Sequence, residues 1–338
     1  GRMAGGSVQL QAAGEFYGTA DARINRGMLR LLMGDLKEGF ADYRWRWRTP
    51  HLVPRPFRQP EWDPARDPPG LSVLVHAEQG LGDVLQFIRY LPLLVARGDR
   101  VTLEVQAALA DFLAPFGATH HLRVVANGDP LPITDRQIPL LCLPRVFHTT
   151  LESLPDGVPY LFADPERIAR WRERLGEGFT VGMVRAGNPS HRNDRNRSLD
   201  PALLGPILAI PGARFFTLQK DPRPGDREKM AAFSLWSEVI DVGPELTDFH
   251  ELAAALAALD LLISVDTAPL HLAGAMGRPA WALLNHPPDW RWLLQRDDSP
   301  WYPSLRLFRQ SRAGAWEEPI QAAAEALRRR VLEGEGAV

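Results

Sequence analysis

Short apolar runs alternate with longer amphipathic stretches through most of the chain beyond residue 70. Runs such as 179–184 (FTVGMV) and 260–265 (DLLISV) are rich in β-branched and apolar residues, which predicts buried strands. Stretches such as 107–117 and 249–259 carry apolar residues at helical spacing. Strands that alternate with helices favour parallel sheets covered by helices on both faces. The pattern therefore predicts the α/β class.

This alternation occurs in two series, one beginning near residue 71 and the other near Phe179. Two such series predict two Rossmann-like domains that face each other across a cleft. Ligands of parallel α/β sheets bind beyond the carboxyl ends of the strands. Each loop that follows a predicted strand is therefore a candidate for chemistry.

The stretch 19–48 has a different pattern, that of two helical segments separated at Gly34 and Asp35. Its glycines, Tyr43 and Pro50 fall at the intervals of a tetratricopeptide helix pair, which this register resembles. An unrelated helical hairpin is the alternative. One such repeat cannot bury its own apolar face, so it must pack on the next domain or end a longer array.

A proline-rich segment follows the helical pair, and it can neither continue a helix nor form a central strand. Whether the last helix crosses back to pack on the N-terminal domain stays open. The predicted parts are a helical tetratricopeptide-like extension (1–56), a proline-rich linker (57–70), an N-terminal Rossmann-like domain (71–165), a C-terminal Rossmann-like domain (166–312) and a C-terminal helix (313–338).

Composition excludes several classes of protein. The 338 residues are 45% hydrophobic and 24% charged with a formal net charge of −2, which gives no bulk attraction for nucleic acid. The single cysteine, Cys142, excludes a disulfide within the chain and a cysteine metal cluster. The nine histidines lack metal-site spacing, so no metal is expected. The longest apolar stretch is too short for a transmembrane segment, and a cytoplasmic location is expected.

The first loop after a strand is HAEQGLGDV, residues 76–84. Gln79, Gly80 and Gly82 precede a helix that has Asp83 in its first turn. The helix dipole stabilises a carboxylate there, but this carboxylate would repel phosphate. The loop therefore suits a base or a hydroxyl-binding group, with a plain helix cap as the alternative interpretation of Asp83. The glycine spacing, with Glu104 at the end of the next strand, also keeps a dinucleotide site open.

Two polar loops follow strands in the second series. The loop at 184–200 holds four arginines, and Arg197 just before a capped helix is the best candidate to neutralise a diphosphate. A solvated surface loop is the alternative. The next loop has Gln219 and Lys220, which could contact a base, a ribose or a phosphate, or could lie in an ordinary loop.

The last of these loops is ISVDTAPLHLAG, residues 263–274. Pro269 favours the first turn of a helix, so Asp266, Thr267 and Ala268 form the turn into it. The free N–H groups and the threonine hydroxyl predict an anion site. A well-capped structural helix is the alternative.

Four segments together resemble a known group of enzymes: EQGLGDVLQFIRYLP, SLDPALLGPI, SVDTAPLHLAGAMGRP and DWRWLLQRDDSPWYPSLRLFRQ. They are similar to bacterial tetratricopeptide-linked glycosyltransferases and to the heptosyltransferases of glycosyltransferase family 9. The resemblance covers about residues 20–335. It implies a GT-B fold and metal-independent transfer from a nucleotide-sugar.

The resemblance also implies roles for individual residues. Asp83 corresponds to the proposed catalytic base, with Gln79, Gly80 and Gly82 on the acceptor side, and Arg197 helps to hold the donor diphosphate. Arg185 stands where the tetratricopeptide-linked relatives carry tryptophan, and Ala268 replaces a glycine of heptosyltransferases. The residues expected at the donor are Arg185, Asn188, His191, Gln219, Lys220, Asp266, Thr267, Ala268 and His271.

The sequence therefore predicts an inverting glycosyltransferase that needs no metal or other cofactor. A carboxylate would deprotonate the acceptor hydroxyl as it attacks, and the helix N-terminus with an arginine would stabilise the leaving diphosphate. A protein acceptor and a glycan or lipid-linked acceptor both remain open. So do a non-catalytic scaffold built on the same fold and a dinucleotide-dependent oxidoreductase.

Overall fold

The computed structural model describes residues 20–49, 52, 54–220, 223–231 and 237–335. These residues form two compact units. The first unit comprises the described residues up to Gly157 together with Asp289–Gln295, and the second comprises Val158–Pro288 and the chain from Arg296 onward. The chain therefore leaves the second unit once, near residue 289, and re-enters it.

The first unit contains a parallel sheet in the order β3-β2-β1-β4. In this sheet Val73 lies opposite Val101 on one side and Arg136 on the other. The elements of this Rossmann-like part are β1 (Ser72–His76), α4 (Leu81–Phe87), η2 (Ile88–Tyr90), α5 (Leu91–Ala96), β2 (Arg100–Val105), α6 (Ala107–Thr119), β3 (Arg123–Ala126), β4 (Arg136–Pro139), η3 (Leu140–Cys142) and α7 (Leu143–Val146).

Two segments of the first unit change conformation along their length. The helical stretch that follows the first loop is divided into α4, η2 and α5. Pro92 at the start of α5 has no N–H to bond the carbonyl of Ile88, which interrupts the helix. The apolar run 138–143 is a strand only as far as Pro139, where β4 ends and the chain turns into η3.

The N-terminal extension is a helical hairpin of α2 (Ala20–Leu32) and α3 (Leu36–Tyr43), followed by η1 (Arg44–Arg48). Gly34 adopts a φ of 89° in the turn, and the Asp35 carboxylate accepts a hydrogen bond from the Glu38 N–H. Gly39 lets the helices approach closely, since a Cβ there would lie 2.7 Å from the Leu31 side chain. Both helices belong to the first unit. The tetratricopeptide assignment stays a prediction.

The second unit contains a parallel sheet in the order β10-β9-β8-β5-β6-β7. Its strands are β5 (Phe179–Val184), β6 (Ala213–Thr217), β7 (Ile240–Asp241), β8 (Leu261–Val265), β9 (Ala280–Leu284) and β10 (Leu305–Arg309). Its helices are α8 (Pro165–Leu175), α9 (Asp194–Arg197), η4 (Pro201–Leu204), α10 (Gly205–Leu208), α11 (Asp226–Ala231), η6 (Gly243–Glu245), α12 (Phe249–Ala258), α13 (Ala268–Ala275) and α14 (Glu317–Glu335). The α/β class with parallel sheets is confirmed.

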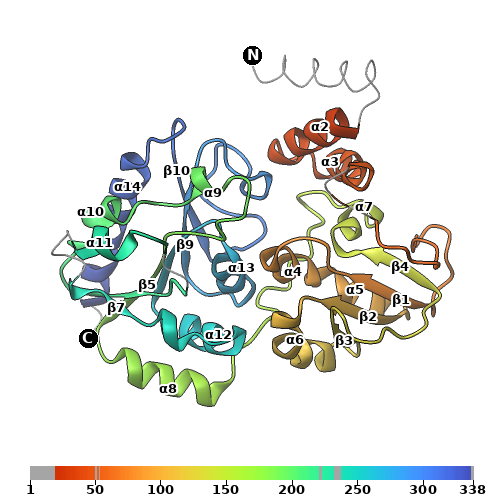
Figure 1. Cartoon of the computed structure of the whole chain (residues 1–338), viewed down its shortest axis with the longest axis horizontal. Helices are drawn as coiled ribbons and strands as arrows, with labels where there is room; N and C mark the ends of the chain where they lie inside the picture. The colour runs from red at the N-terminus through yellow and green to blue at the C-terminus, as the bar shows by residue number, and fades with distance from the viewer. Residues whose placement is uncertain (1–19, 50–51, 53, 221–222, 232–236, 336–338) are drawn as a thin grey trace. The chain divides into compact units, whose positions relative to one another are not determined.

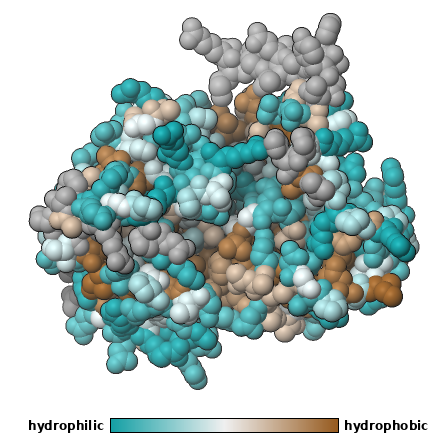
Figure 2. Space-filling view, in the orientation of Figure 1, coloured by the Kyte–Doolittle hydropathy of each residue, from teal (hydrophilic) through white to brown (hydrophobic). Residues whose placement is uncertain are grey.

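The C-terminal helix α14 packs in the second unit, beside β9, β10 and α10. Its apolar residues Ile320, Ala323 and Leu327 are buried in one core cluster with side chains of β5 and β8. The segment that returns to the first unit is instead η7 (Trp290–Trp292), where Trp290 packs edge-on against Phe40 of α3. The visible face in Figure 2 is mostly hydrophilic on each unit, with small hydrophobic patches.

Candidate functional site

The loop after β1 leads into α4 (Figure 1). Asp83 lies in the first turn of that helix. Its Oδ2 accepts a hydrogen bond of 2.7 Å from the Gly80 N–H, so Asp83 caps the helix. Its Oδ1 is ion-paired with the Arg291 guanidinium, and 16% of the side chain is exposed. The interpretation of Asp83 as a helix cap is therefore correct. Its ion pair with Arg291 is an additional contact that the sequence did not indicate.

Arg291 holds this carboxylate in a fixed position. Its Nε–H donates to Gln86 Oε1 at 2.8 Å, and its Nη1 donates to Asp289 Oδ1 at 2.8 Å. Burial alone would lower the pKa of Arg291, but Asp289 and Asp83 raise it above its ordinary value. A carboxylate has about four acceptor positions, so Asp83 keeps room for a hydroxyl hydrogen bond.

The extension is bonded to the same loop. Arg46 of η1 donates to both oxygens of Glu78, at 2.8 and 2.6 Å, and both side chains are buried. Tyr43 accepts a bond of 3.0 Å from the Gln79 amide, and Glu78 accepts one of 3.1 Å from the Leu141 N–H. A buried two-pronged ion pair is strong and directional. The loop that precedes Asp83 is therefore held by the N-terminal extension.

Glu104, the acid of the alternative dinucleotide site, is engaged inside the first unit. It lies at the end of β2, opposite His76 of β1, and its carboxylate pairs with Arg55, just before the proline-rich linker. Only 3% of the Glu104 side chain is exposed. A ribose would have to displace Arg55 to reach it.

In the second unit, the loop after β5 is held by ion pairs. Arg185 is buried, pairs with Asp226 of α11 and donates to the Leu199 carbonyl at 3.3 Å. Arg223 pairs with Asp194 of α9. The Arg185 guanidinium is thus engaged by partners within the second unit and is not left for a ligand. Asn188 and His191 of the same loop are exposed.

Arg197 connects this loop to the turn after β8. Its Nη1 donates to the Asp266 carbonyl at 2.8 Å, and its side chain is 13% exposed. A Cβ on Gly187 would lie 2.4 Å from the Arg197 guanidinium, so a larger residue there would make the guanidinium move. Gln219 accepts a bond of 3.1 Å from the Ala186 N–H of the same loop, while Lys220 donates to the Thr247 carbonyl at 3.2 Å.

The turn into α13 leaves backbone donors unused. Thr267 is the N-cap, and its hydroxyl donates to the Val265 carbonyl at 3.2 Å rather than facing outward. Within the described residues, the N–H groups of Thr267 and Ala268 have no acceptor. Pro269 contributes no N–H. The first turn of α13 therefore offers the partial positive charge and free donors that bind anions.

His271 lies under this turn with a partner on each side. Its Nε2 is 3.5 Å from Asp266 Oδ1, and its Nδ1 is 3.0 Å from the Tyr302 hydroxyl. Tyr302 is fully buried, and a Cβ on Gly274 would lie 2.4 Å from its ring. The imidazole ring therefore lies between the Asp266 carboxylate and the Tyr302 hydroxyl. Tyr302 belongs to one of the four segments that carry the family resemblance, but its contact with His271 could not be predicted from the sequence.

The predicted residues thus form two groups, one in each unit. Asp83 with Gln79, Gly80 and Gly82 lies at the strand ends of the first unit. Arg197 and Asp266 are bonded to each other in the second. Among the described residues, no group of three or more histidines, cysteines or acids is placed to hold a metal ion. Nor is any described helix long and apolar enough to cross a membrane.

Residues 226–312, which include the turn after β8, match the model of Glycosyltransferase family 9 (heptosyltransferase). The chain is 30% identical over 355 aligned residues to Protein FlbA of Caulobacter vibrioides (strain ATCC 19089 / CIP 103742 / CB 15). That alignment covers 94% of this chain and 57% of FlbA. The chain therefore spans little more than half the length of this relative.

Solved structures share the fold at low identity. An E. coli ADP-heptose LPS heptosyltransferase II has a TM-score of 0.54 and 15% identity, covering 78% of this chain and 99% of its own. A family 9 glycosyl transferase from Veillonella parvula DSM 2008 has a TM-score of 0.52 and 14% identity, covering 78% and 97%. The iron-containing dodecameric glycosyltransferase TibC from enterotoxigenic E. coli H10407 has a TM-score of 0.50 and 14% identity, covering 82% and 77%.

These likenesses show an α/β fold of parallel sheets like that of GT-B heptosyltransferases. The family 9 match falls on the part of the second unit that contains the turn into α13. Together, the matched segment and the fold support a glycosyltransferase related to family 9.

Proposed function

We propose that the protein is an inverting glycosyltransferase that moves a sugar from a nucleotide-sugar to an acceptor hydroxyl without a metal ion. The observation that carries this proposal is the turn into α13, which lies in the segment that matches family 9 and has unused N–H groups. Arg197, from the loop after β5, is hydrogen-bonded to this turn. In metal-independent transfer, such a helix N-terminus and a guanidinium would stabilise the negative charge on the leaving diphosphate.

On the donor side, Arg197 would hold the diphosphate while its bond to the Asp266 carbonyl keeps the turn in place. A guanidinium has five N–H donors, so this one bond leaves others for phosphate. Asn188, His191 and Lys220 are exposed and would contact the base, ribose or sugar. Three residues act by positioning instead: Arg185 through Asp226, Gln219 through Ala186, and His271 through Asp266.

On the acceptor side, Asp83 would take the proton of the attacking hydroxyl. Its carboxylate is oriented by the Gly80 N–H and by Arg291, which a general base requires. The hydroxyl would attack the anomeric carbon from the face opposite the leaving nucleoside diphosphate, which inverts that centre. The bonds from the extension to Glu78 and Gln79 support a part for the extension in acceptor recognition, and a protein acceptor fits that part.

A thermal-stabilisation screen of nucleoside diphosphates and nucleotide-sugars, run in EDTA, tests the donor side. A ligand that binds only the folded protein raises its melting temperature by mass action. One nucleoside diphosphate should stabilise the protein at a concentration well above its dissociation constant, with and without EDTA. If no nucleoside diphosphate shifts the melting temperature, the proposed donor site is wrong. If stabilisation disappears in EDTA, metal independence is wrong.

A further inference from the structure

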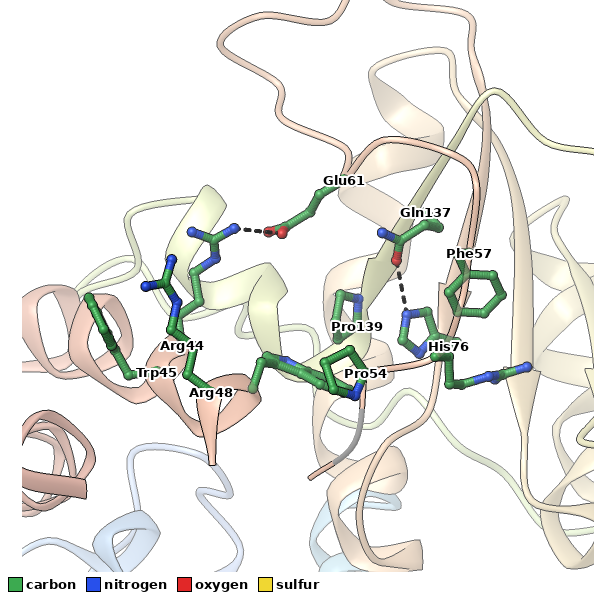
Figure 3. A pocket seen from close by; sticks show the side chains of 11 residues that line it. Arg44, Trp45, Arg48, Pro54, Phe57, Glu61, His76, Gln137 and Pro139 are labelled. Carbon is green, nitrogen blue, oxygen red and sulfur yellow. Dashed lines mark hydrogen bonds and ion pairs between the residues drawn. The ribbon is translucent and has the colours of Figure 1, made fainter. Parts of the chain in front are cut away.

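The first unit contains a cavity of about 320 Å³ that the proposed chemistry does not use. It is enclosed by η1, by the proline-rich linker and by the carboxyl ends of β1 and β4. Figure 3 shows Arg44 and Trp45 on one side and His76 and Phe57 on the other. Cavities of this size hold small ligands or one or two side chains of a partner.

The cavity has more guanidinium groups than carboxylates. Three arginines, Arg44, Arg48 and Arg55, line it together with one carboxylate, that of Glu61. Glu61 lies 2.7 Å from Arg44 and 2.8 Å from Arg145, which is outside the lining. Arg55 pairs with Glu104. Arg48 is exposed, and within the described residues it has no carboxylate partner. Its guanidinium lies 4.5 Å from the centre of the Trp45 ring, which holds it at the rim. The cavity is therefore complementary to a negatively charged group.

The rest of the lining is apolar or neutral. Trp47, Phe57 and Pro139 supply apolar surface, and the buried His76 ring lies 4.8 Å from Phe57. Burial lowers the pKa of His76 to about 4, although a hydrogen bond with Gln137 opposes the shift, so the ring is neutral at physiological pH. Grooves lined by aromatic residues and proline are typical sites for extended peptides, and arginine clusters recognise acidic motifs.

The cavity lies beside the loop that leads to Asp83. His76 is the last residue of β1, and the chain runs directly from it through Glu78 and Gln79 into α4. Arg46, between the cavity residues Trp45 and Trp47, makes the buried ion pair with Glu78. A ligand in the cavity would therefore be held by the same elements that fix the acceptor loop.

We propose that this arginine–tryptophan pocket binds an acidic side chain in an extended segment of a protein acceptor, near the hydroxyl that receives the sugar. The link to sugar transfer rests on the proposed function, whereas the binding itself does not. The planar guanidinium of Arg48 has the geometry to bind a carboxylate in a two-pronged fashion. Arg44 and Arg145 each donate only one hydrogen bond to Glu61.

The test uses the full chain and two fluorescein-labelled peptides, Ala-Glu-Ser-Glu-Ala and its neutral counterpart Ala-Gln-Ser-Gln-Ala. Fluorescence anisotropy, measured without any donor, should show binding of the acidic peptide at least about tenfold tighter than the neutral one. Arg48→Gln should remove most of this difference, because it deletes the unpaired guanidinium. Arg123→Gln is the control, since it removes the same charge from an exposed position at the amino end of β3.

Equal affinities for the two peptides would overturn the proposal, as would an Arg48→Gln protein that keeps the preference or an Arg123→Gln protein that loses it equally. Melting temperatures of the variants with a nucleoside diphosphate separate this test from the proposed function. Arg48→Gln should keep nucleotide stabilisation. If the acidic peptide binds but no nucleotide stabilises the protein, the pocket proposal is supported and the proposed transfer activity is wrong.

Discussion

Arginines at the strand ends decide the local chemistry through the partners they already have. Arg291 orients Asp83, Arg185 is neutralised by Asp226, and Arg197 donates to the Asp266 carbonyl. All three residues are arginines, but they differ in the N–H groups that remain available to a ligand. A buried guanidinium with internal partners fixes geometry, while one with unused N–H groups can bind a ligand.

Arg197→Ala should weaken binding of the stabilising nucleoside diphosphate about tenfold or more, because a charge-assisted hydrogen bond and the support of the Asp266 turn are lost together. Arg195→Ala, an exposed neighbour in α9, is the matched control and should bind normally. Isothermal titration calorimetry measures both. Equal affinity in the two variants would show that Arg197 does not hold the diphosphate.

His76 should make stability depend on pH. Its folded pKa of about 4 lies below the usual value of 6.5, so the unfolded chain binds the proton more tightly. This contribution to stability is complete above about pH 6.5 and is lost as pH falls through 4. It amounts to no more than about 3 kcal/mol.

Urea unfolding between pH 4 and 7 tests this expectation. Stability of the wild-type chain should fall more steeply toward low pH than that of His76→Gln, which has no titrating ring. Parallel curves for the two proteins would mean that His76 is not buried in its neutral form.

At the scale of elements, α13 and the two hairpin helices depend on close approach. Gly274 allows Tyr302 to lie against α13 and reach His271, and Gly39 allows α2 to lie against α3. In each case a Cβ would meet a packed side chain within 3 Å. At both positions glycine is needed for close packing and not for a left-handed backbone conformation.

Gly274→Ala should therefore destabilise the protein by about 1–3 kcal/mol, the usual cost of overpacking. Gly205→Ala is the control, because nothing lies within 4 Å of a Cβ at that helical position and alanine favours helix. Denaturant midpoints measure both. A Gly274→Ala protein as stable as the control would mean that Tyr302 moves away without cost.

Most elements could be predicted because their signals are local. The strands β5, β8, β9 and β10 coincide with apolar runs, and α12 and α14 with helical spacing. The contacts of the site could not be predicted, because Asp83 and Arg291 lie more than two hundred positions apart in sequence. The helix α8 was missed because its charged stretch exposes most side chains, although Asp164 caps it.

At the scale of the whole molecule, the two units differ in the groups that they present at their strand ends. The first has a fixed carboxylate and, beside it, a cationic pocket. The second has a helix N-terminus with an arginine. This division suits a transferase with an acceptor and a phosphate-bearing donor. The cytoplasmic location stays a prediction, and the iron reported for TibC makes a metal test worthwhile.

The most direct test of sugar transfer is the release of nucleoside diphosphate from a panel of nucleotide-sugars in EDTA, with water as the acceptor. One nucleotide-sugar should be hydrolysed slowly but measurably. Asp83→Asn should lower that rate at least about a hundredfold, as loss of a general base does, while binding the nucleotide normally. A wild-type protein that binds nucleotide-sugars but consumes none would contradict the account and favour a non-catalytic scaffold, and an unchanged rate in Asp83→Asn would remove Asp83 from catalysis.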